Sequence, residues 1–353
     1  MLKLVFVFVL QLTVSGIMAQ SELNTQHTGD KIDLSGEWLF QVDSLDKGVG
    51  QQWWLTALSD KIHLPGSMTT NGKGDEVTAN TKWTGGIWNN AWFTDTAYAK
   101  YRQPGNVKIS FWLQPVKHYV GVAWYQKKVR IPVGWKDHSV ELFLERAHWE
   151  TTVWIDSHEA GMQNALGAPD VFGLDHLTPG EHTLTIRIDN RIKDINPGAD
   201  AHSVTDNTQT NWNGIIGRML LIKQPPIHFS DVQVFPDLDK KVIHVNMKLV
   251  NNSGREINGL LNLSVKGINL PFSAHIPPAM GKSVSVQKDT TDLVIDFPMG
   301  NHPLPWDEFH PNLYAMRVEI SGVNNKDIRK IDFGMRKWVA RGEQLTVNGR
   351  PVF

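Results

Sequence analysis

Three observations predict an all-β protein built from two antiparallel sandwiches in succession. From Ile32 onward, short segments alternate β-branched or aromatic residues with polar ones, which is the period of a strand with one buried face. Gly and Pro separate these segments, as in Pro132-Val133-Gly134 and Pro179-Gly180. No amphipathic helical pattern lies between them, which argues against a parallel sheet with crossover helices. The length of 353 residues suits two domains, or three small ones.

The first sandwich is expected over residues 32–224. Its recognisable strand segments lie at 32–42, 126–131, 140–144, 151–155 and 183–188. Twelve of the 14 Trp residues lie at or before Trp212, so flat aromatic surface is concentrated in this half of the chain. Residues 51–106 are rich in Trp and Gly and irregular in pattern, which predicts long loops over one end of the sandwich.

A second sandwich is expected over residues 225–332. Pro225 and Pro226 mark its beginning, because two prolines cannot continue a central strand. Six or seven short strands follow, a pattern typical of an immunoglobulin-like sandwich of ~100 residues. The clearest segments lie at 229–235, 242–250, 259–265, 283–287, 293–297 and 313–320. Residues 333–353 then contain a β-like segment at 345–347 and an Asn348-Gly349 turn.

The N-terminus has the pattern of a secretory signal. Lys3 is followed by an apolar run, and small or apolar residues lead to an expected cleavage after Ala19, so residues 1–20 are interpreted as a signal peptide. Residues 21–31 are polar and interpreted as a flexible leader. Export to a periplasmic or extracellular location is therefore expected. A lipid anchor is not expected, because the chain has no Cys, and no later segment approaches the 18 apolar residues of a membrane span.

Composition excludes several kinds of partner and site. Lys and Arg total 35 and Asp and Glu total 36, which leaves a net charge of −1 and no basic stripe for nucleic acid. The absence of Cys removes disulfides and thiolate metal sites. The 14 His residues form no HExxH motif, and no phosphate loop, dinucleotide fingerprint or GxSxG elbow is present. We therefore expect no metal site and no cofactor.

The segment from His202 to Arg218, HSVTDNTQTNWNGIIGR, stands out as a polar loop between strands. It combines hydroxyls, amides, the carboxylate of Asp206 and the indole of Trp212, and little in it suits a core. One interpretation is a site where the first domain meets a ligand or another domain. The alternative is a loop whose Asx, Ser and Thr side chains bond to one another and only cover a sheet edge.

The order of several short motifs resembles the front half of family 2 glycoside hydrolases, the group of β-galactosidases, β-glucuronidases and β-mannosidases. Each motif is weak alone, but together they cover Ile32 to Phe353 in the family's order. They are Leu34-Ser35-Gly36-Glu37-Trp38, Leu64-Pro65-Gly66, Gly121-Val122-Ala123-Trp124-Tyr125 with Val129-Arg130-Ile131-Pro132, Thr152-Val153-Trp154-Ile155-Asp156 with Gly161, Pro179-Gly180-Glu181-His182-Thr183-Leu184 with Asp189-Asn190-Arg191, Gly214-Ile215-Ile216-Gly217-Arg218, Trp306 with Pro311-Asn312-Leu313-Tyr314, Phe333-Gly334-Met335-Arg336, and Val347-Asn348-Gly349-Arg350-Pro351-Val352-Phe353.

The resemblance implies a different role for each part of the chain. Residues 32–224 would be the sugar-binding jelly roll, of galactose-binding type, residues 225–332 the immunoglobulin-like sandwich, and residues 333–353 the start of a (β/α)8 barrel that is itself missing. The two catalytic Glu residues of the family lie on that barrel, at its strand ends. A retaining glycosidase needs two carboxyl groups ~5–5.5 Å apart, whereas Glu145, Glu150 and Asp156 are scattered and expected at the surface. We therefore assign no catalytic residue and expect the chain alone to be inactive, with the barrel as its natural intramolecular partner.

The resemblance also implies which residues would contact a carbohydrate. In the family, jelly-roll loops reach over the barrel mouth, and one of them corresponds to Asp206 to Asn213 here. Asn211 and Asn213 can donate to and accept from sugar hydroxyls, and Trp212 offers an apolar face to a pyranose ring. His118 lies in a second loop that corresponds to a sugar-contacting position. The expected substrate-binding residues are Asp206, Asn211, Trp212, Asn213 and His118, with no metal ligand because the family's acidic cation-binding position has no clear counterpart.

Three interpretations follow from the sequence. The favoured one is the front part of an exported exo-glycosidase of carbohydrate catabolism that hydrolyses a β-glycoside, with a β-galactosidase-like enzyme slightly preferred. Another is a stand-alone secreted carbohydrate-binding protein, for which the Trp-rich first domain is the support. A third is an assembly protein whose two sandwiches contact partners through an exposed apolar patch.

Overall fold

The computed structural model describes residues 30–193, 195, 197–198, 200–202, 204–208, 210–270, 275–322 and 325–352. The expected signal peptide, almost all of the leader, and Phe353 lie outside the described residues. Within these described ranges, no helix has both the length and the apolar character needed to cross a membrane.

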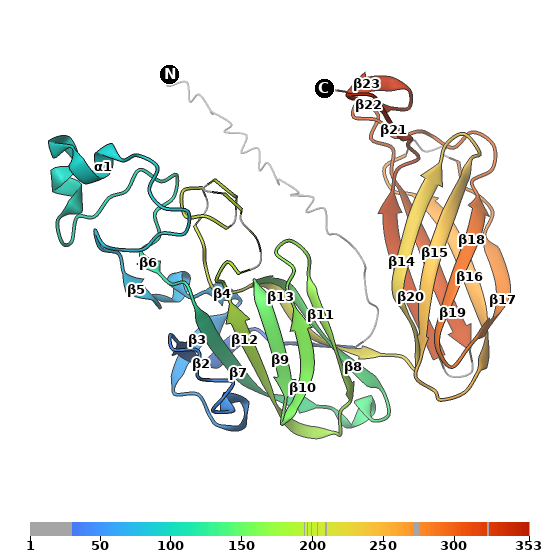
Figure 1. Cartoon of the computed structure of the whole chain (residues 1–353). Coiled ribbons are helices and arrows are strands. Elements are labelled where there is room, and N and C mark those ends of the chain that lie inside the picture. Colours follow the sequence, from blue (N-terminus) through green and yellow to red (C-terminus); the bar gives the residue numbers. More distant parts are fainter. Residues whose placement is uncertain are drawn as a thin grey trace, which may run out of the picture.

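The first sandwich consists of two antiparallel sheets (Figure 1). Its strands are β1 Lys31–Asp33, β2 Gly36–Asp43, β3 Asp60–Leu64, β4 Gly66–Ser67, β7 Val122–Ile131, β8 Ser139–His148, β9 Glu150–Ile155, β10 His158–Gln163, β11 Asp170–His176, β12 Gly180–Asp189 and β13 Gly214–Gln224. One sheet has the order β1-β13-β8-β11, with β4 paired to β13, and the other has the order β10-β9-β12-β7-β2-β3. This arrangement is the jelly-roll sandwich that the sequence predicts.

Strand alternation fills the space between these sheets with apolar side chains. Trp38 and Phe40 of β2, Tyr125 of β7 and Leu142 of β8 are at most 1% exposed. Removing each such side chain from water contributes about 1.5–3 kcal/mol before conformational entropy is counted. The indole N–H of Trp38 donates to the carbonyl of Leu34 at 2.9 Å, so the buried ring leaves no polar group unpaired.

A small subdomain lies between β4 and β7 and projects beyond the sheets in Figure 1. It contains η2 Thr69–Asn71, β5 Asp75–Glu76, α1 Ala91–Thr94, η3 Thr96–Arg102 and β6 Lys117–His118, and β5 pairs with β6. Trp83, Trp92 and Ile109 are its buried centre. The prediction of loops over residues 51–106 is therefore only partly right, because β3 within that range pairs with β2 and extends the sheet. Two further short helical turns are η1 Trp53–Leu55 and η4 Val133–Trp135.

The second sandwich follows directly after the Pro225-Pro226 pair. Its strands are β14 Ile227–Asp237, β15 Val242–Asn251, β16 Ile257–Gly267, β17 Met280–Val286, β18 Asp289–Pro298, β19 Tyr314–Gly322 and β20 Asn325–Phe333. They form sheets of order β14-β15-β18 and β17-β16-β19-β20, as expected for an immunoglobulin-like sandwich. A hairpin-like sheet of β21 Trp338–Arg341, β22 Gln344–Val347 and β23 Arg350–Val352 ends the described chain.

A buried ion pair joins the two sheets of the second sandwich. Asp327 and Arg329 of β20 are each 3% exposed and lie 2.7 Å apart. Asp327 accepts from the backbone N–H of Phe229 at 2.8 Å, and Arg329 donates to the carbonyl of the same residue at 2.5 Å. These bonds pair both charges and fix β14 against β20, which is the condition under which a buried ion pair is tolerated.

Candidate functional site

Loops from both sheets of the first sandwich meet at one end. In the ladders, Asp189 at the end of β12 pairs with Val122 at the start of β7, and Gly214 at the start of β13 pairs with His148 at the end of β8. The segments before β7 and before β13 therefore emerge together, and we call this the loop end. The predicted polar loop ends at Asn213, because Gly214 to Arg218 belong to β13; the loop interpretation was wrong for those five residues.

Asp206 lies at the centre of the loop end and is fully buried. Its carboxylate accepts from the backbone N–H of Thr84 at 2.7 Å and from that of Asn211 at 3.0 Å. Nε2 of His118 lies 3.1 Å from the same carboxylate. Asp206 therefore joins the polar loop to two segments of the small subdomain, the one at Thr84 and β6, and its oxygens face protein groups.

Asn211 and Asn213 are also buried, with 2% and 1% exposure. The amide of Asn211 exchanges hydrogen bonds with Asn190, donating to its carbonyl at 3.0 Å and accepting from its side chain at 3.1 Å. The amide of Asn213 donates to the carbonyls of Gly121 and Ile188, both at 3.1 Å, while its oxygen accepts from the hydroxyl of Tyr125 at 2.7 Å. Both amides thus hold the loop to the ends of β7 and β12.

Trp212 lies between these two anchors and is partly exposed. Its ring stacks on His148 with centroids 4.5 Å apart and an interplanar angle of 29°. Nδ1 of His148 lies 2.7 Å from the carbonyl of Trp212, which fixes the imidazole as well. His148 is 0% exposed. Of the polar-loop residues predicted to contact a sugar, Trp212 has the side chain that reaches the surface.

His118 is 8% exposed and packs its ring edge-on against Trp83, with centroids 4.7 Å apart. The structure therefore brings His118, Asp206 and Asn211 together as one bonded group, with Trp212 and Asn213 beside it. Sugar contact by these residues remains a prediction. For all but Trp212, direct contact would require the loop end to rearrange. Without such a rearrangement, these residues would act only by positioning the backbone of the loop.

A network of charges next to the loop end was not predicted. Asp189 is fully buried and accepts from Nε of Arg191 at 2.9 Å, and Lys193 lies 2.9 Å from it. Burial works to raise the pKa of Asp189, but these hydrogen bonds outweigh it and hold the pKa at about 2. Asp46 and Glu150 complete the network by pairing with Arg191 and Lys193 at 2.6 Å each. Glu150 is therefore not the surface carboxylate that the sequence suggested, since only 14% of its side chain is exposed.

Asp170 is a second buried carboxyl close to this end. It is 0% exposed, and neither carboxylate oxygen has a hydrogen-bond partner within the described part of the chain. Burial raises its pKa to about 6, while the nearby hydroxyl of Thr151 acts in the opposite direction. Across the described ranges, no three His, Cys, Asp or Glu side chains gather in a way that could hold a metal ion.

The alternative interpretation, a loop bonded to itself, describes only one bond of Asp206, Asn211 and Asn213, the one from the Asn211 N–H to Asp206, because their other partners lie outside the loop. Sequence reasoning missed Thr84, Asn190 and Asp189. The last two had been noted only as part of a family motif, and nothing in the sequence indicates that Asn190 would pair with Asn211.

Comparison with known proteins shows what this chain is similar to. Residues 227–336 match the family model described as glycosyl hydrolases family 2. The β-galactosidase large subunit of Lactobacillus acidophilus is 22% identical over 347 residues, which is 93% of this chain and 50% of that protein. The chain thus spans about half the length of this curated relative.

Solved structures share the same fold. The β-glucuronidase of Bacteroides uniformis has a TM-score of 0.62 at 16% identity, covering 93% of this chain and 35% of its own. The β-glucuronidase of Ruminococcus gnavus has a TM-score of 0.59 at 15% identity, with 93% and 48% covered. A family 2 member from Bacteroides cellulosilyticus has a TM-score of 0.62 at 17% identity, with 91% and 37% covered. These matches and the family model confirm the resemblance of the chain to the N-terminal, non-catalytic part of a family 2 glycoside hydrolase, a jelly roll followed by an immunoglobulin-like sandwich.

Proposed function

We propose that this chain forms the front domains of an exported exo-glycosidase that hydrolyses β-galactosides in carbohydrate catabolism. The observation that carries the proposal is the alignment of 93% of the chain with half of a β-galactosidase large subunit. The β-glucuronidase structures support the fold alone, since their identities are 17% or less. A neutral sugar is also supported by the loop end, where the cations Arg187, Arg191 and Lys193 are paired with carboxylates of the protein.

The front domains would shape one side of the substrate site without performing the chemistry. Trp212 would offer the exposed part of its ring to the apolar face of a terminal sugar. Asp206, Asn211, Asn213 and His118 would act by holding the loop that carries Trp212, through the bonds described above. The two carboxyl groups of a retaining mechanism would come from a barrel domain that residues 30–352 do not contain. The described chain by itself would therefore be inactive.

Export is proposed from the signal-like N-terminus. Cleavage after Ala19 would leave Gln20 as the first residue of the mature protein. N-terminal sequencing of the secreted protein checks this directly. Recovery of the protein from the cytoplasm with Met1 still present would contradict it.

The experiment that tests the proposed activity is to read the gene beyond the codon for Phe353 and to assay the complete product. An open frame of about 300 further residues with two barrel glutamates is expected, by the size of such barrels. The product should hydrolyse p-nitrophenyl β-galactoside faster than the β-glucuronide or β-mannoside, whereas residues 1–353 alone should hydrolyse none of them. Hydrolysis by residues 1–353, or a preference for the glucuronide, would overturn the proposal.

A further inference from the structure

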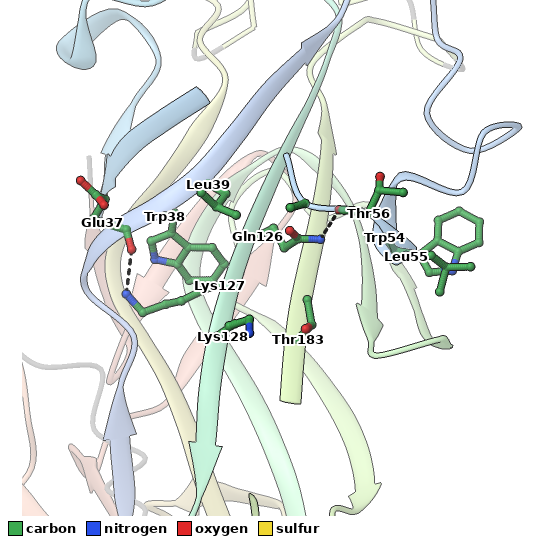
Figure 2. A pocket seen from close by; sticks show the side chains of 11 residues that line it. Glu37, Trp38, Leu39, Trp54, Leu55, Thr56, Gln126, Lys127, Lys128 and Thr183 are labelled. Carbon is green, nitrogen blue, oxygen red and sulfur yellow. Dashed lines mark hydrogen bonds between the residues drawn. The ribbon is translucent and has the colours of Figure 1, made fainter. Parts of the chain in front are cut away.

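A groove of about 490 Å³ lies on the outer face of the six-stranded sheet of the first sandwich (Figure 2). Its floor consists of Leu39 from β2, Gln126 and Lys128 from β7, and Thr183 from β12, and residues 54–57 form one wall. The volume lies within the range of about 300–1,000 Å³ that is usual for small-molecule sites. The groove is separate from the loop end, because Gln126 is four residues along β7 from Val122, about 13 Å at the rise of a strand.

The aromatic wall of this groove is held rigidly. Trp54 stacks on Trp154 with centroids 5.0 Å apart and an interplanar angle of 3°, and on Trp124 with centroids 6.4 Å apart and an angle of 23°. Trp124 and Trp154 are buried, so the stack anchors Trp54, a residue of the groove wall, to the sheet. An aromatic side chain fixed in this way loses little conformational freedom when a ligand binds.

The loop that carries Trp54 is also fixed at its base and at its far side. The carboxylate of Asp43 accepts from the backbone N–H groups of Lys47 and Gly48, both at 2.8 Å, and from the indole of Trp124 at 3.0 Å. Beyond Trp54, the amide of Gln126 donates to the carbonyl of Thr56 at 3.0 Å. Figure 2 shows this bond spanning the groove floor and the wall. The groove is therefore a preformed feature.

The lining suits a carbohydrate better than a peptide. The apolar surfaces of Trp54, Leu55 and Leu39 lie beside the hydroxyl of Thr183 and the ammonium of Lys128, a mixture that matches the apolar faces and hydroxyl edges of a pyranose. A peptide could not add as a strand here, because β2, β7 and β12 are interior strands paired on both sides.

The charges around the groove favour a neutral ligand. Lys128 is paired with Glu181 at 2.7 Å, and Lys61 at the edge is paired with Glu37 at 2.8 Å. Lys127 directs its ammonium group to the carbonyls of Ser35 at 3.3 Å and Glu37 at 3.0 Å. Lys127 keeps its charge, which the nearby carboxylates of Asp33 and Glu37 offset in part, so the lining carries no cluster of free cations for the carboxylate of a uronic acid.

We propose that this groove is a glycan-binding site for short neutral oligosaccharides, distinct from the loop end. Trp54 and Leu55 would pack on a sugar face, and Thr183 and Lys128 would contact its hydroxyls. The site would hold the protein near a polymeric substrate without taking part in hydrolysis. It does not depend on the proposed activity, because it is built entirely from the first sandwich.

The test is a saturation-transfer NMR titration of the full chain with cellotriose, mannotriose and a β-linked galactotriose, with trigalacturonate as the charged comparison. At least one neutral trisaccharide is expected to bind at millimolar concentration, and trigalacturonate is not. Trp54→Ala and Leu55→Asp should each weaken binding at least about tenfold. Leu55 is 54% exposed, so its substitution keeps the test valid if Trp54→Ala fails to fold.

Matched controls are Leu45→Asp, at a position 70% exposed in the same loop but outside the groove, and Trp112→Ala, at a position 82% exposed in the small subdomain. Both should bind like the unaltered chain. The proposal is overturned if no neutral trisaccharide binds, if trigalacturonate binds better, or if Trp212→Ala abolishes binding while Leu55→Asp leaves it unchanged. That last result would place the sugar at the loop end, in support of the proposed function and against the groove.

Discussion

Asn213 illustrates how a single residue organises the loop end. It is 1% exposed and uses both ends of its amide, with Tyr125 on one side and two backbone carbonyls on the other. An amide in this position connects the polar loop to β7 and β12 because it both donates and accepts. Polar side chains that satisfy buried backbone groups are costly to remove, since their partners are left without water or protein to bond to.

We therefore expect Asn213→Ala to destabilise the first sandwich by about 1–3 kcal/mol, because the Tyr125 hydroxyl and two carbonyls lose their partner. Urea unfolding followed by Trp fluorescence measures the change. Asn80→Ala is the matched control, because Asn80 is exposed and should change stability by less than about 0.5 kcal/mol. Equal stability of the two variants would show that the Asn213 bonds do not hold the loop.

Asp170 gives a second prediction at the scale of a single residue, on how the stability of the fold depends on pH. Its pKa is about 6 in the folded chain against 3.8 for the unfolded side chain, so the folded state binds more protons between these values. Stability should therefore fall as pH rises from about 4 to about 6, by up to about 3 kcal/mol, and the loss should be complete above that range.

Asp170→Asn removes this titration and should be more stable than the unaltered chain at pH 7. The difference should shrink as the pH approaches 4, where Asp170 is protonated in both states. Free energies of unfolding at several pH values provide the measurement. A constant difference between pH 4 and pH 7 would mean that Asp170 titrates normally.

At the scale of elements, alternation of apolar and polar residues was enough to find most strands but not all. Strands such as β12 and β15 keep strict alternation and were predicted. β13 was not, because a bulge between Ile216 and Met219 interrupts its register and two glycines, Gly214 and Gly217, lie at its start. β3 was missed because it has only five residues and lies in a segment dominated by Trp and Gly.

The candidate site was predictable only as a location. The polar composition of the segment before Gly214 indicated a loop with side chains that bond, and that is what Asp206 and Asn211 do. Their partners Thr84 and Asn190 come from distant segments, and sequence spacing carries no information on such pairings. The groove was missed for the same reason, since its floor and wall come from three strands and a loop that only folding brings together.

The loop between β2 and β3 gives a prediction on how closely its backbone packs against Trp124 and Asp43. A Cβ on Gly48 would lie 2.5 Å from Nε1 of Trp124 and 2.7 Å from the Asp43 carboxylate, inside the hydrogen bond that anchors the loop. We expect Gly48→Ala to destabilise the first sandwich by about 1–3 kcal/mol and to alter the fluorescence of the Trp stack.

Gly50→Ala is the control in the same loop, because the nearest atom to its Cβ would be 3.7 Å away and its φ is not positive. Its stability should stay within about 0.5 kcal/mol of the unaltered chain. If Gly48→Ala unfolds at the same urea concentration as Gly50→Ala, the loop is not anchored as tightly as the distances indicate.

At the scale of the whole molecule, the two sandwiches have separate cores. Among the described residues, none belongs to both clusters of buried apolar side chains. The chain passes between them at Pro225 and Pro226, and the polar contact between Asn252 and Ser139, 3.0 Å, lies next to this passage. A junction of this kind transmits little stability from one core to the other, so unfolding need not be a single transition.

We expect scanning calorimetry to resolve two transitions, and single core substitutions to move one of them at a time. Phe297 is 0% exposed in the second core, and Phe297→Ala should cost about 3–5 kcal/mol there. Leu142 is 0% exposed in the first core, and Leu142→Ala should lower the other transition by about 2–5 kcal/mol. Because each variant serves as the control for the other, the assignment does not depend on which transition is higher. One transition that both variants shift equally would mean that the sandwiches unfold as a unit, and that the junction at Pro225 couples them more strongly than its contacts suggest.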